Sequence, residues 1–383
     1  MEEIYLDNAA TTKPYPAVVT KIKDALTEAY GNPSSLHGKG LEAEKLIKAA
    51  RKEIADQLKV KTDEIYFTSG GTEANNLAIK GAVNALHRSG NRIITSSIEH
   101  PSVLNIFKRL EKQGYDVKYL SVDQTGVIDL DQLEEYLTNE TILVSIMGVN
   151  NELGSIQPLA KIGRLLAPYD KLYFHVDGVQ AFTKLDIFPA KLGIDLYSVS
   201  AHKIHGPKGV GALYIKDSTR IDNLISGSKQ ESGIRPGTEN VPGIVGFGEA
   251  VKEVNREDFT ATIFRLKKLL VNRILDEIEG STLNGPTIEQ GASHIVNISF
   301  AGIKGEILVH SLERDNIYVS TGAACSSRLA TPSYVLEEIG VASDLIEGAI
   351  RFSLSSQTTK QEINYTVNRL KEHITTLKEI IQR

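Results

Sequence analysis

Two short apolar stretches end in residues that could do chemistry. Asp177 follows the run at residues 172–176, and Lys203 lies just beyond a second run at residues 195–199. A lysine removed from water has a lowered pKa and can form an imine. A carboxylate can hold a pyridine nitrogen protonated, so the pair matches what pyridoxal phosphate (PLP) chemistry requires. Both residues also have ordinary interpretations: a solvated surface lysine, and an aspartate that caps a helix.

A glycine turn and a histidine follow other apolar runs in the same way. The turn Ser69–Thr72, which contains Gly71 and Thr72, opens directly into a helical pattern. Its backbone and the helix N-terminus could bind a phosphate, although a tight turn capped by Thr72 is an equally weighted alternative. His100 precedes Pro101 in a predicted loop, where it could stack on a flat ring or transfer a proton. A structural role is commoner for a single histidine.

The single cysteine and an arginine in an apolar stretch lie downstream. Cys325 is flanked by small and polar residues, which favours an accessible thiol over the more usual buried one. An accessible thiol is typical of a nucleophile or carrier, and with no second cysteine any group it accepts must leave to another molecule. The charge of Arg351 must be paired. An internal salt bridge and a bidentate clamp on a substrate carboxylate both satisfy that need.

Composition excludes several classes of protein. The 383 residues are 41% hydrophobic and 24% charged, as in ordinary globular proteins. The net charge of −5, with no segment dominated by Lys and Arg, argues against direct nucleic-acid binding. No apolar run approaches the ~18 residues of a membrane helix, and residues 1–7 have no signal-peptide pattern. We therefore expect a cytoplasmic protein without a membrane partner, and no metal site.

Strand patterns alternate with helical patterns between residues 40 and 215. Strands are predicted at residues 64–68, 92–96, 117–122, 142–147, 172–176, 196–200 and 210–215. Helical patterns at residues 73–87, 103–113, 130–137 and 162–167 separate most of them. This alternation predicts an α/β fold with a mostly parallel seven-stranded sheet flanked by helices. The connection to the last strand is too short for a helical crossover, so that strand should be antiparallel.

The pattern changes after Pro242. The segments that follow predict a smaller α+β domain. They are a helix at residues 259–279, a strand at 295–300, a helix at 305–314, a short strand at 349–353 and a final helix from 360. We expect a large domain of residues 15–258, and a small domain of residues 1–14 and 259–383 that carries the cysteine.

The predicted topology gathers the chemically useful residues. In open parallel sheets, ligands bind beyond the carboxyl ends of the strands. Five candidate residues follow predicted strands, so we expect them to converge on one edge of the sheet. They are Thr72, His100, Asn151, Asp177 and Lys203.

Several longer motifs resemble the cysteine desulfurases of the NifS/IscS type, in the class V aminotransferase family with PLP fold type I. They extend over nearly the whole chain and occur in the family's order. They are Tyr5–Thr12, Gly31–Ser35, Thr68–Asn76, His175–Asp177, Ser200–Lys203, Arg235–Asn240 and Pro332–Leu336.

The resemblance implies a role for each site residue. Lys203 would form the imine with PLP, Asp177 would hold the ring nitrogen, Gln180 would bond the ring hydroxyl, and His100 would stack on the ring and assist proton transfer. The phosphate would be bound by Gly71, Thr72, Ser200 and His202, and by Thr238 from the second subunit of a homodimer. Asn151 and Arg351 would hold the substrate carboxylate, and Cys325 would accept the sulfur.

The implied reaction converts L-cysteine to L-alanine and leaves a persulfide on Cys325. The persulfide would pass to an acceptor protein, either an iron–sulfur scaffold or a tRNA-thiolation enzyme.

Three alternatives remain open at this point. Another PLP-dependent lyase or aminotransferase of the same fold would not need Cys325, and a selenocysteine lyase would act on a different substrate. A catalytically silent scaffold that binds partners through the cysteine segment would bind no PLP. The presence of Lys203, Asp177 and His100 argues against this last alternative.

Overall fold

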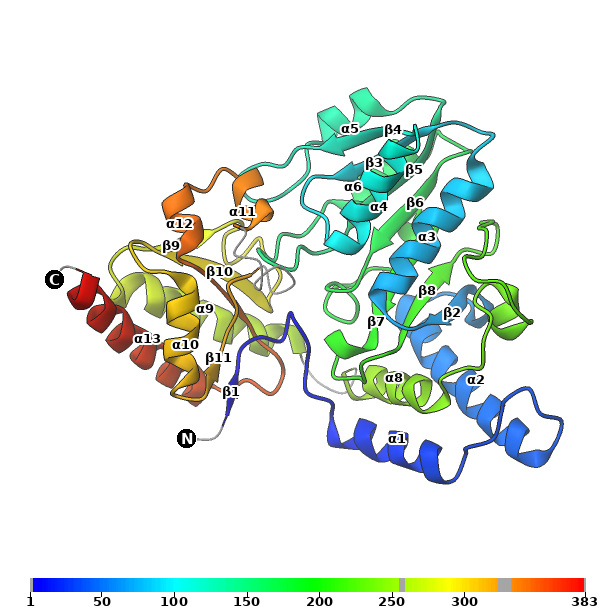
Figure 1. Ribbon diagram of the computed structural model, residues 1–383, viewed down its shortest axis with the longest axis horizontal. Helices are drawn as coiled ribbons and strands as arrows, with labels where there is room; N and C mark the ends of the chain where they lie inside the picture. The colour runs from blue at the N-terminus through cyan, green and yellow to red at the C-terminus, as the bar shows by residue number, and fades with distance from the viewer. Residues whose placement is uncertain (1–2, 255–258, 323–331, 382–383) are drawn as a thin grey trace.

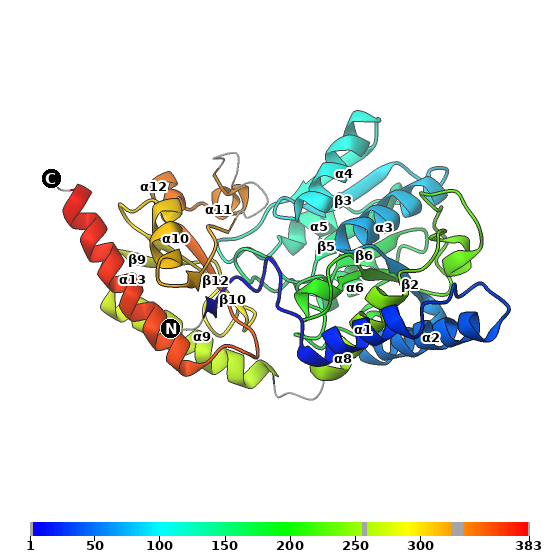
Figure 2. The ribbon, with the colours of Figure 1, turned by 60° about the horizontal axis from the view of Figure 1, so that its bottom comes forward.

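The protein forms two lobes in a computed structural model that describes residues 3–254, 259–322 and 332–381 (Figures 1 and 2). The larger lobe contains the central sheet, and the smaller lobe contains the long C-terminal helix. The chain begins in the smaller lobe, crosses to the larger one, and returns for its last third (Figure 1). The predicted domain boundaries, 15–258 against 1–14 and 259–383, stay a prediction.

The large sheet has the seven strands that the sequence predicts, in the order β2-β8-β7-β6-β5-β3-β4. Their bounds are β2 (Ile65–Thr68), β3 (Arg92–Ser96), β4 (Asp116–Leu120), β5 (Thr141–Met147), β6 (Tyr173–Asp177), β7 (Leu196–Ser200) and β8 (Gly211–Ile215). All neighbours pair in parallel except β8, which is antiparallel to both β7 and β2. The expectation of a mostly parallel sheet with an antiparallel last strand is therefore confirmed.

Helices cover both faces of this sheet, so most of its strands are buried on both sides. On one face, α3 (Gly71–Leu86) and α4 (Pro101–Lys112) pack on alternate strand residues such as Leu143 and Leu196. On the other face lie α1 (Pro16–Thr27), α2 (Gly38–Leu58), α5 (Leu130–Tyr136), α6 (Leu159–Leu166) and α8 (Val241–Val254). The short helix α7 (Pro189–Leu192) links β6 to β7.

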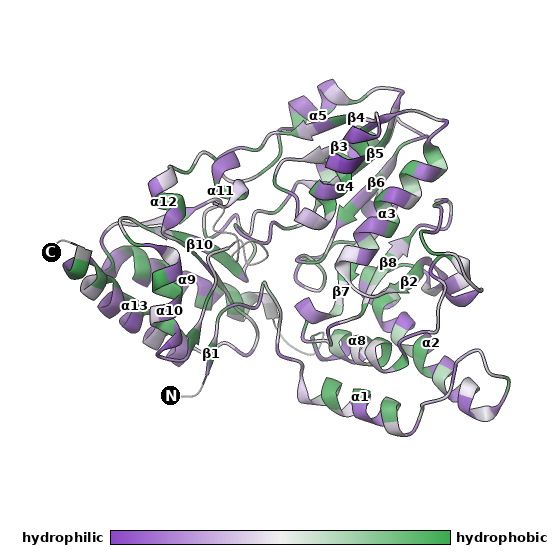
Figure 3. Cartoon of the chain, in the orientation of Figure 1, coloured by the Kyte–Doolittle hydropathy of each residue, from purple (hydrophilic) through white to green (hydrophobic). Residues whose placement is uncertain are grey.

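The smaller lobe is built on a three-stranded antiparallel sheet, β12-β10-β9. Its strands are β9 (Ser281–Asn284), β10 (Ile295–Phe300) and β12 (Ala349–Ser353). The helices α9 (Phe259–Glu277), α10 (Gly305–Glu313) and α13 (Lys360–Ile381) share a core with it. The hydropathy colouring shows β10 as a hydrophobic strand (Figure 3). In addition, β1 (Ile4–Tyr5) pairs in parallel with β11 (Ile317–Tyr318), so the N-terminal strand belongs to this lobe.

A small apolar cluster joins the two lobes beside the sheet edge. Ile98 and Leu153, from loops after β3 and β5, pack with Val335 and Leu336 of α11 (Tyr334–Glu338). The neighbouring helix α12 (Ser343–Glu347) contributes Ile346. These contacts fix the smaller lobe against the strand ends where we expect the site.

The sequence predicted most elements to within two or three residues but missed some. The elements not predicted individually are the helices α1, α2, α7, α8, α11 and α12 and the short strands β1, β9 and β11. Asp177, expected just after a strand, is the last residue of β6. His100, expected in a loop, is the N-cap of α4, because Pro101 at the first helical position cannot donate a backbone hydrogen bond.

None of the helices in the described ranges is long and apolar enough to cross a lipid bilayer.

Close packing of α2 on α8 yields a stability prediction. A side-chain carbon at Gly248 would lie 2.7 Å from both Cα and Cβ of Ala50. Glycine to alanine in a helix interior normally stabilises by about 1 kcal/mol. For Gly248→Ala we expect the opposite, a loss of about 1–3 kcal/mol, because overpacking forces the helices apart.

Thermal unfolding would measure the change, with Gly38→Ala as the matched control. Gly38 lies on α2, the helix that Gly248 of α8 packs against, but a carbon at Gly38 would meet no atom within 4 Å. A Gly248→Ala protein as stable as Gly38→Ala would contradict close packing of these helices.

Candidate active site

The strand ends of the large sheet bring the predicted residues together. Gly211 of β8 lies opposite Thr68 of β2 on one side and Ser200 of β7 on the other. The turn after β2 is therefore adjacent to the end of β7. Asp177 pairs with Ser198 of β7 and with Met147 of β5, so it lies on the same edge.

The turn between β2 and α3 approaches Ser200 closely. Gly70 has a φ of +151°, which only glycine adopts readily, and a side-chain carbon at Gly71 would lie 2.7 Å from Val179 Cγ2. Gly70 is the N-cap and Thr72 lies in the exposed first turn, so the alternative that Thr72 caps the helix is wrong. Ser200 Oγ is buried and has no hydrogen-bond partner among the described residues. A helix N-terminus beside an unused hydroxyl is suited to bind a phosphate.

Asp177 is held by two donors. Asn75 Nδ2 donates to its Oδ2 at 2.7 Å, and the backbone N–H of Val179 donates to its Oδ1 at 3.0 Å. The carboxylate is buried, and these bonds fix its orientation at the end of β6. The helix-cap interpretation does not describe it, because its partners are a side chain of α3 and a turn.

A hydrogen-bonded chain links His100 to Asp177. Ser102 Oγ lies 2.8 Å from His100 Nδ1 and accepts from Asn75 Nδ2 at 2.9 Å, and Asn75 also donates to Asp177. His100 Nδ1 also accepts from the backbone N–H of Ser102, so the neutral ring carries its proton on Nε2. Burial lowers the pKa of His100, Asp177 opposes that shift, and Lys203 adds to it. The ring is therefore neutral at pH 7.

Lys203 reaches the segment that enters from the smaller lobe. Its Nζ donates to the carbonyl oxygens of Ala9 at 2.6 Å and Ala10 at 2.8 Å. Gln180 Nε2 donates to the same Ala9 oxygen at 2.8 Å. Lys184 Nζ lies 3.5 Å from Gln180 Oε1, and burial, with a smaller contribution from Lys203, lowers the pKa of Lys184 to about 7.

Two histidines beside Lys203 are neutral. Burial, together with nearby lysines, lowers the pKa of His202 to about 3. Burial also lowers the pKa of His205 to about 4. His202 Nδ1 lies 3.2 Å from Thr11 Oγ1. A neutral His202 has one ring N–H, so it could donate one hydrogen bond to a phosphate but would add no charge.

Arg351 lies in the interior of β12 and is 2% exposed. Its Nη2 donates to Asp7 Oδ1 at 2.7 Å, and its Nη1 donates to the carbonyl oxygens of Asn151 at 3.0 Å and Gly322 at 3.1 Å. The internal salt bridge, one of the two alternatives that the sequence left open, is present. Arg351 Nε is buried without a partner in the part of the chain that the structure describes, so one donor remains for a carboxylate.

Comparison with known proteins identifies the family. Residues 4–366 match the family model described as aminotransferase class-V. The chain is 44% identical to "Cysteine desulfurase IscS" of Dictyoglomus turgidum, over 99% of this chain and 96% of that one, and 43% identical to the Methanosarcina thermophila protein of the same name, over 98% and 93%. The chain belongs to the class V aminotransferase family, among its NifS/IscS-type cysteine desulfurases.

Solved structures of the same family share the fold. A structure titled "NIFS-LIKE PROTEIN" superposes with a TM-score of 0.90 at 37% identity, covering 98% of this chain and 100% of that one. Another, "SspA in complex with cysteine", gives 0.82 at 37% identity, covering 93% and 100%. Members of this family are PLP-dependent, so this desulfurase-family chain is a PLP enzyme with fold type I.

The residues present fit PLP. Ser200 Oγ and the N-terminus of α3 offer unused donors for the phosphate, and Gly71 leaves no side chain in the way. Asp177 presents an oriented carboxylate for the ring nitrogen. Lys203, three positions after Ser200, could form the imine. Gln180 is close enough to Lys203 to share a carbonyl partner with it.

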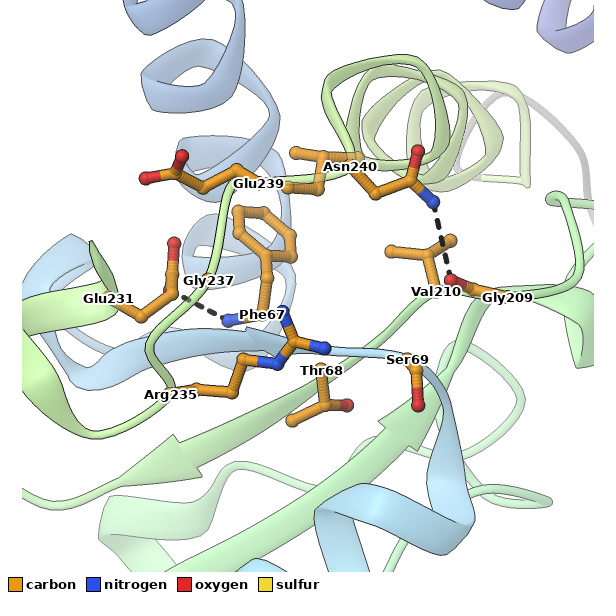
Figure 4. Close-up of a pocket in the computed structure, with 11 residues that line it drawn as sticks. Phe67, Thr68, Ser69, Gly209, Val210, Glu231, Arg235, Gly237, Glu239 and Asn240 are labelled. Atoms are coloured by element: carbon orange, nitrogen blue, oxygen red, sulfur yellow. Dashed lines mark hydrogen bonds between the residues drawn. The ribbon is translucent and has the colours of Figure 1, made fainter. Parts of the chain in front are cut away.

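A pocket lies beside the turn between β2 and α3 (Figure 4). It is lined by Thr68 and Ser69, by Gly209, and by Arg235 and Gly237 of the 235–240 loop. Arg235 Nε donates to Glu73 Oε1 at 2.8 Å, which fixes the loop to α3. Thr238 of the same loop is exposed. This pocket is not lined by Lys203, Asp177 or His100, three of the residues predicted to hold the cofactor.

Cys325 falls within residues 323–331, outside the described residues. Within the described ranges, no cluster of three or more histidine, cysteine, aspartate or glutamate side chains could hold a metal ion.

Sequence reasoning missed several residues that hold the site together. Asn75 and Ser102 connect His100 to Asp177. Asn75 lies one helical turn after Thr72, in a helix whose N-terminus was expected to bind phosphate. Residues three positions apart share one face of a helix, so this spacing could have placed Asn75 near the site. The carbonyl of Ala9 had no such signal, since its contact with Lys203 joins residues 194 positions apart.

The buried carboxyl of Glu99 yields a prediction about pH. Its Oε1 accepts from Ser96 Oγ at 2.7 Å and Met147 N at 2.8 Å, and its Oε2 has no described partner. Burial raises the pKa of Glu99 to about 8, from an ordinary value of 4.5. Between these values the folded protein binds one more proton than the unfolded chain. This group's contribution to stability is therefore complete below pH 4.5 and is lost as the pH rises to about 8, by up to about 1.4 kcal/mol per pH unit.

We expect Glu99→Gln, which imitates the protonated form, to remove this part of the pH dependence. The free energy of unfolding should be measured by denaturant titration between pH 5 and pH 9, with Glu134→Gln on the exposed face of α5 as the control. An unchanged slope in Glu99→Gln would contradict a protonated Glu99.

Proposed function

We propose that this enzyme converts L-cysteine to L-alanine and transfers the sulfur to Cys325 as a persulfide. The observation that carries the proposal is Arg351, a buried guanidinium with an unused Nε. It is bonded to the carbonyl of Asn151 and to that of Gly322, three positions before the only cysteine. A guanidinium in that state is suited to bind a carboxylate. The printed names of the relatives and of the structure with cysteine support L-cysteine as the substrate.

The chain's own residues can divide the work. Arg351, with Asn151, would hold the substrate carboxylate. PLP, when bound, withdraws electrons from the substrate's α-carbon. Lys203 would move the α-proton, and neutral His100 would exchange a proton through its Nε2 side.

The sulfur step balances without an outside oxidant. The Cys325 thiolate would attack the substrate sulfur, so that an S–S bond forms while the Cβ–S bond breaks. The electron pair of the broken bond stays with the substrate carbon, which takes up a proton to give L-alanine. The outer sulfur of the persulfide would then be transferred to a thiol of an acceptor protein.

We also propose a homodimer that works in the reducing cytoplasm. Several large apolar side chains are exposed around α1 and α2, among them Leu26, Tyr30, Leu36 and Leu41. A second copy would cover them, and the exposed Thr238 would be available to the phosphate of the other subunit. A persulfide carrier needs a free thiol, which a reducing compartment maintains. An iron–sulfur scaffold or a tRNA-thiolation enzyme would accept the sulfur.

The central experiment is Cys325→Ala. We expect L-alanine formation from L-cysteine to fall at least a hundredfold, because removing a reacting nucleophile costs several kcal/mol of transition-state stabilisation, on the order of 3 kcal/mol or more. The absorbance of bound PLP should match the parent. Turnover of L-cysteine at the parent rate would contradict the proposal and favour another PLP-dependent lyase or aminotransferase.

Two further measurements separate the remaining alternatives. Borohydride should trap PLP on the parent but not on Lys203→Ala, and the absence of trapped PLP on the parent would instead favour a catalytically silent scaffold. Turnover of L-selenocysteine that persists in Cys325→Ala while L-cysteine turnover is lost would indicate selenocysteine lyase activity.

A further inference from the structure

Lys184 is a buried lysine to which the function above assigns nothing. Its side chain is 7% exposed, and no carboxylate within the described ranges forms an ion pair with it. Burying a charged group without an opposite charge is costly, so a lysine in this state is a candidate for a functional role. Its Nζ lies 3.5 Å from Oε1 of Gln180, one of the residues predicted to hold PLP.

The backbone just before Lys184 is strained. Thr183 has a φ of +65°, in the left-handed region that β-branched residues rarely adopt. Its Oγ1 is buried and has no hydrogen-bond partner among the described residues, so the Thr183 hydroxyl does not offset the strain. Strained residues persist where the surrounding structure fixes them, often at functional sites. This turn therefore keeps Lys184 in the interior at a cost in backbone energy.

The contact with Lys184 sets the orientation of the Gln180 amide. An ammonium group only donates hydrogen bonds, and a backbone carbonyl only accepts them. Lys184 therefore faces the amide oxygen of Gln180, while Gln180 Nε2 donates to the carbonyl of Ala9 at 2.8 Å. With its oxygen directed toward Lys184, Gln180 presents N–H groups on the side of Ala9.

Lys203 lies on that same side of Gln180. Its Nζ donates to the same Ala9 oxygen at 2.6 Å, so the two donor nitrogens are neighbours. In PLP, the ring hydroxyl is attached next to the carbon that carries the imine-forming aldehyde. The second N–H of Gln180 Nε2 would therefore be available, as a donor, to the ring oxygen of PLP joined to Lys203.

The charged and titratable groups around Lys184 are bases. Burial lowers the pKa of Lys184, and Lys203 adds to that shift. Burial also lowers the pKa values of His202, His205 and His294, and Lys184 contributes to each of these shifts. No carboxylate of the described residues contributes to any of the four. An anionic cofactor would therefore favour the charged, donating form of Lys184.

We propose that Lys184 is a positioning residue for the PLP ring, acting through Gln180. It holds the amide so that Gln180 donates to the ring oxygen beside the imine. A donor to that oxygen draws electron density from it, and the oxygen then holds the imine proton less firmly. Without Lys184, the imine should keep its proton to higher pH. This inference rests on the roles proposed for Gln180 and Lys203, but not on L-cysteine as the substrate.

The test is a pH titration of the absorbance of the PLP-loaded protein, with Lys184→Met as the variant. Methionine fills a similar volume but has no donor. We expect the midpoint of the titration to rise by about half a pH unit or more, because the lost hydrogen bond favoured the unprotonated imine.

Lys267→Met is the matched control. Lys267 is 1% exposed and donates to the carbonyl of Ala292 at 2.9 Å, and among the described residues it bonds none that is predicted to hold PLP. Its midpoint should match the parent. Thr183→Gly should match the parent too, because it removes the strain while Lys184 stays in place.

A double-mutant cycle decides whether Lys184 acts through Gln180. Gln180→Leu alone should raise the midpoint at least as much as Lys184→Met does. Adding Lys184→Met to Gln180→Leu should then change little, since residues that act through one contact are not additive.

Each outcome supports or overturns the positioning role. A parent-like midpoint in Lys184→Met overturns it, and so does a shift of the same size with and without Gln180. An equal shift in Lys267→Met also overturns it, because that pattern reflects the loss of any buried lysine. Should Lys184→Met not fold, a parent-like midpoint in Gln180→Leu would overturn the role, and a raised one would support it.

These measurements are independent of the proposed function. None of them uses L-cysteine, so they decide the role of Lys184 even if the parent forms no L-alanine. Conversely, a parent-like midpoint in Lys184→Met would leave the conversion of L-cysteine to be judged by Cys325→Ala.

Discussion

The buried guanidinium of Arg351 is the interaction on which the arrangement of the site depends. A buried charge must be paired, and removing one partner of such a pair costs several kcal/mol. The charge of Arg351 is paired with the carboxylate of Asp7 in the N-terminal segment. Its guanidinium also donates to the carbonyl oxygens of Asn151, in the loop after β5, and of Gly322, four residues after β11. Three distant parts of the chain therefore meet at one side chain. The N-terminal segment, held there by Asp7, then brings Ala9 and Ala10 to Lys203.

The second organising constraint is the edge of the large sheet. Parallel strands place their carboxyl ends together. The topology alone therefore brings Asp177 and the residues that follow β2, β3, β5 and β7 to one edge of the sheet. Sheet geometry brings these residues close, and hydrogen bonds set their orientation. Asn75 and Ser102 orient Asp177 and His100, while Gln180 shares the Ala9 carbonyl with Lys203. The site is thus a set of strand ends connected by side chains from helices α3 and α4.

Burial also sets the protonation of the bases around Lys203. His100, His202, His205 and Lys184 all have lowered pKa values, chiefly because burial disfavours their charged forms. The histidines are therefore neutral at pH 7, and Lys184 is near its midpoint. Neutral histidines add no positive charge beside Lys203.

The sequence alone determined the α/β class, the seven strands, the antiparallel last strand and the residues at the strand ends. These follow from apolar periodicity, connection length and residue type, which are local properties. Only the tertiary structure decided three pairings, which are Arg351 with Gly322, Ser333 with Glu152 and Lys203 with Ala9. Each joins residues 29 to 194 positions apart, and no local pattern records which distant carbonyl or carboxylate a side chain will meet. The chemistry of single residues was therefore readable from their types, whereas their relative placement required the packing of two lobes around one buried charge.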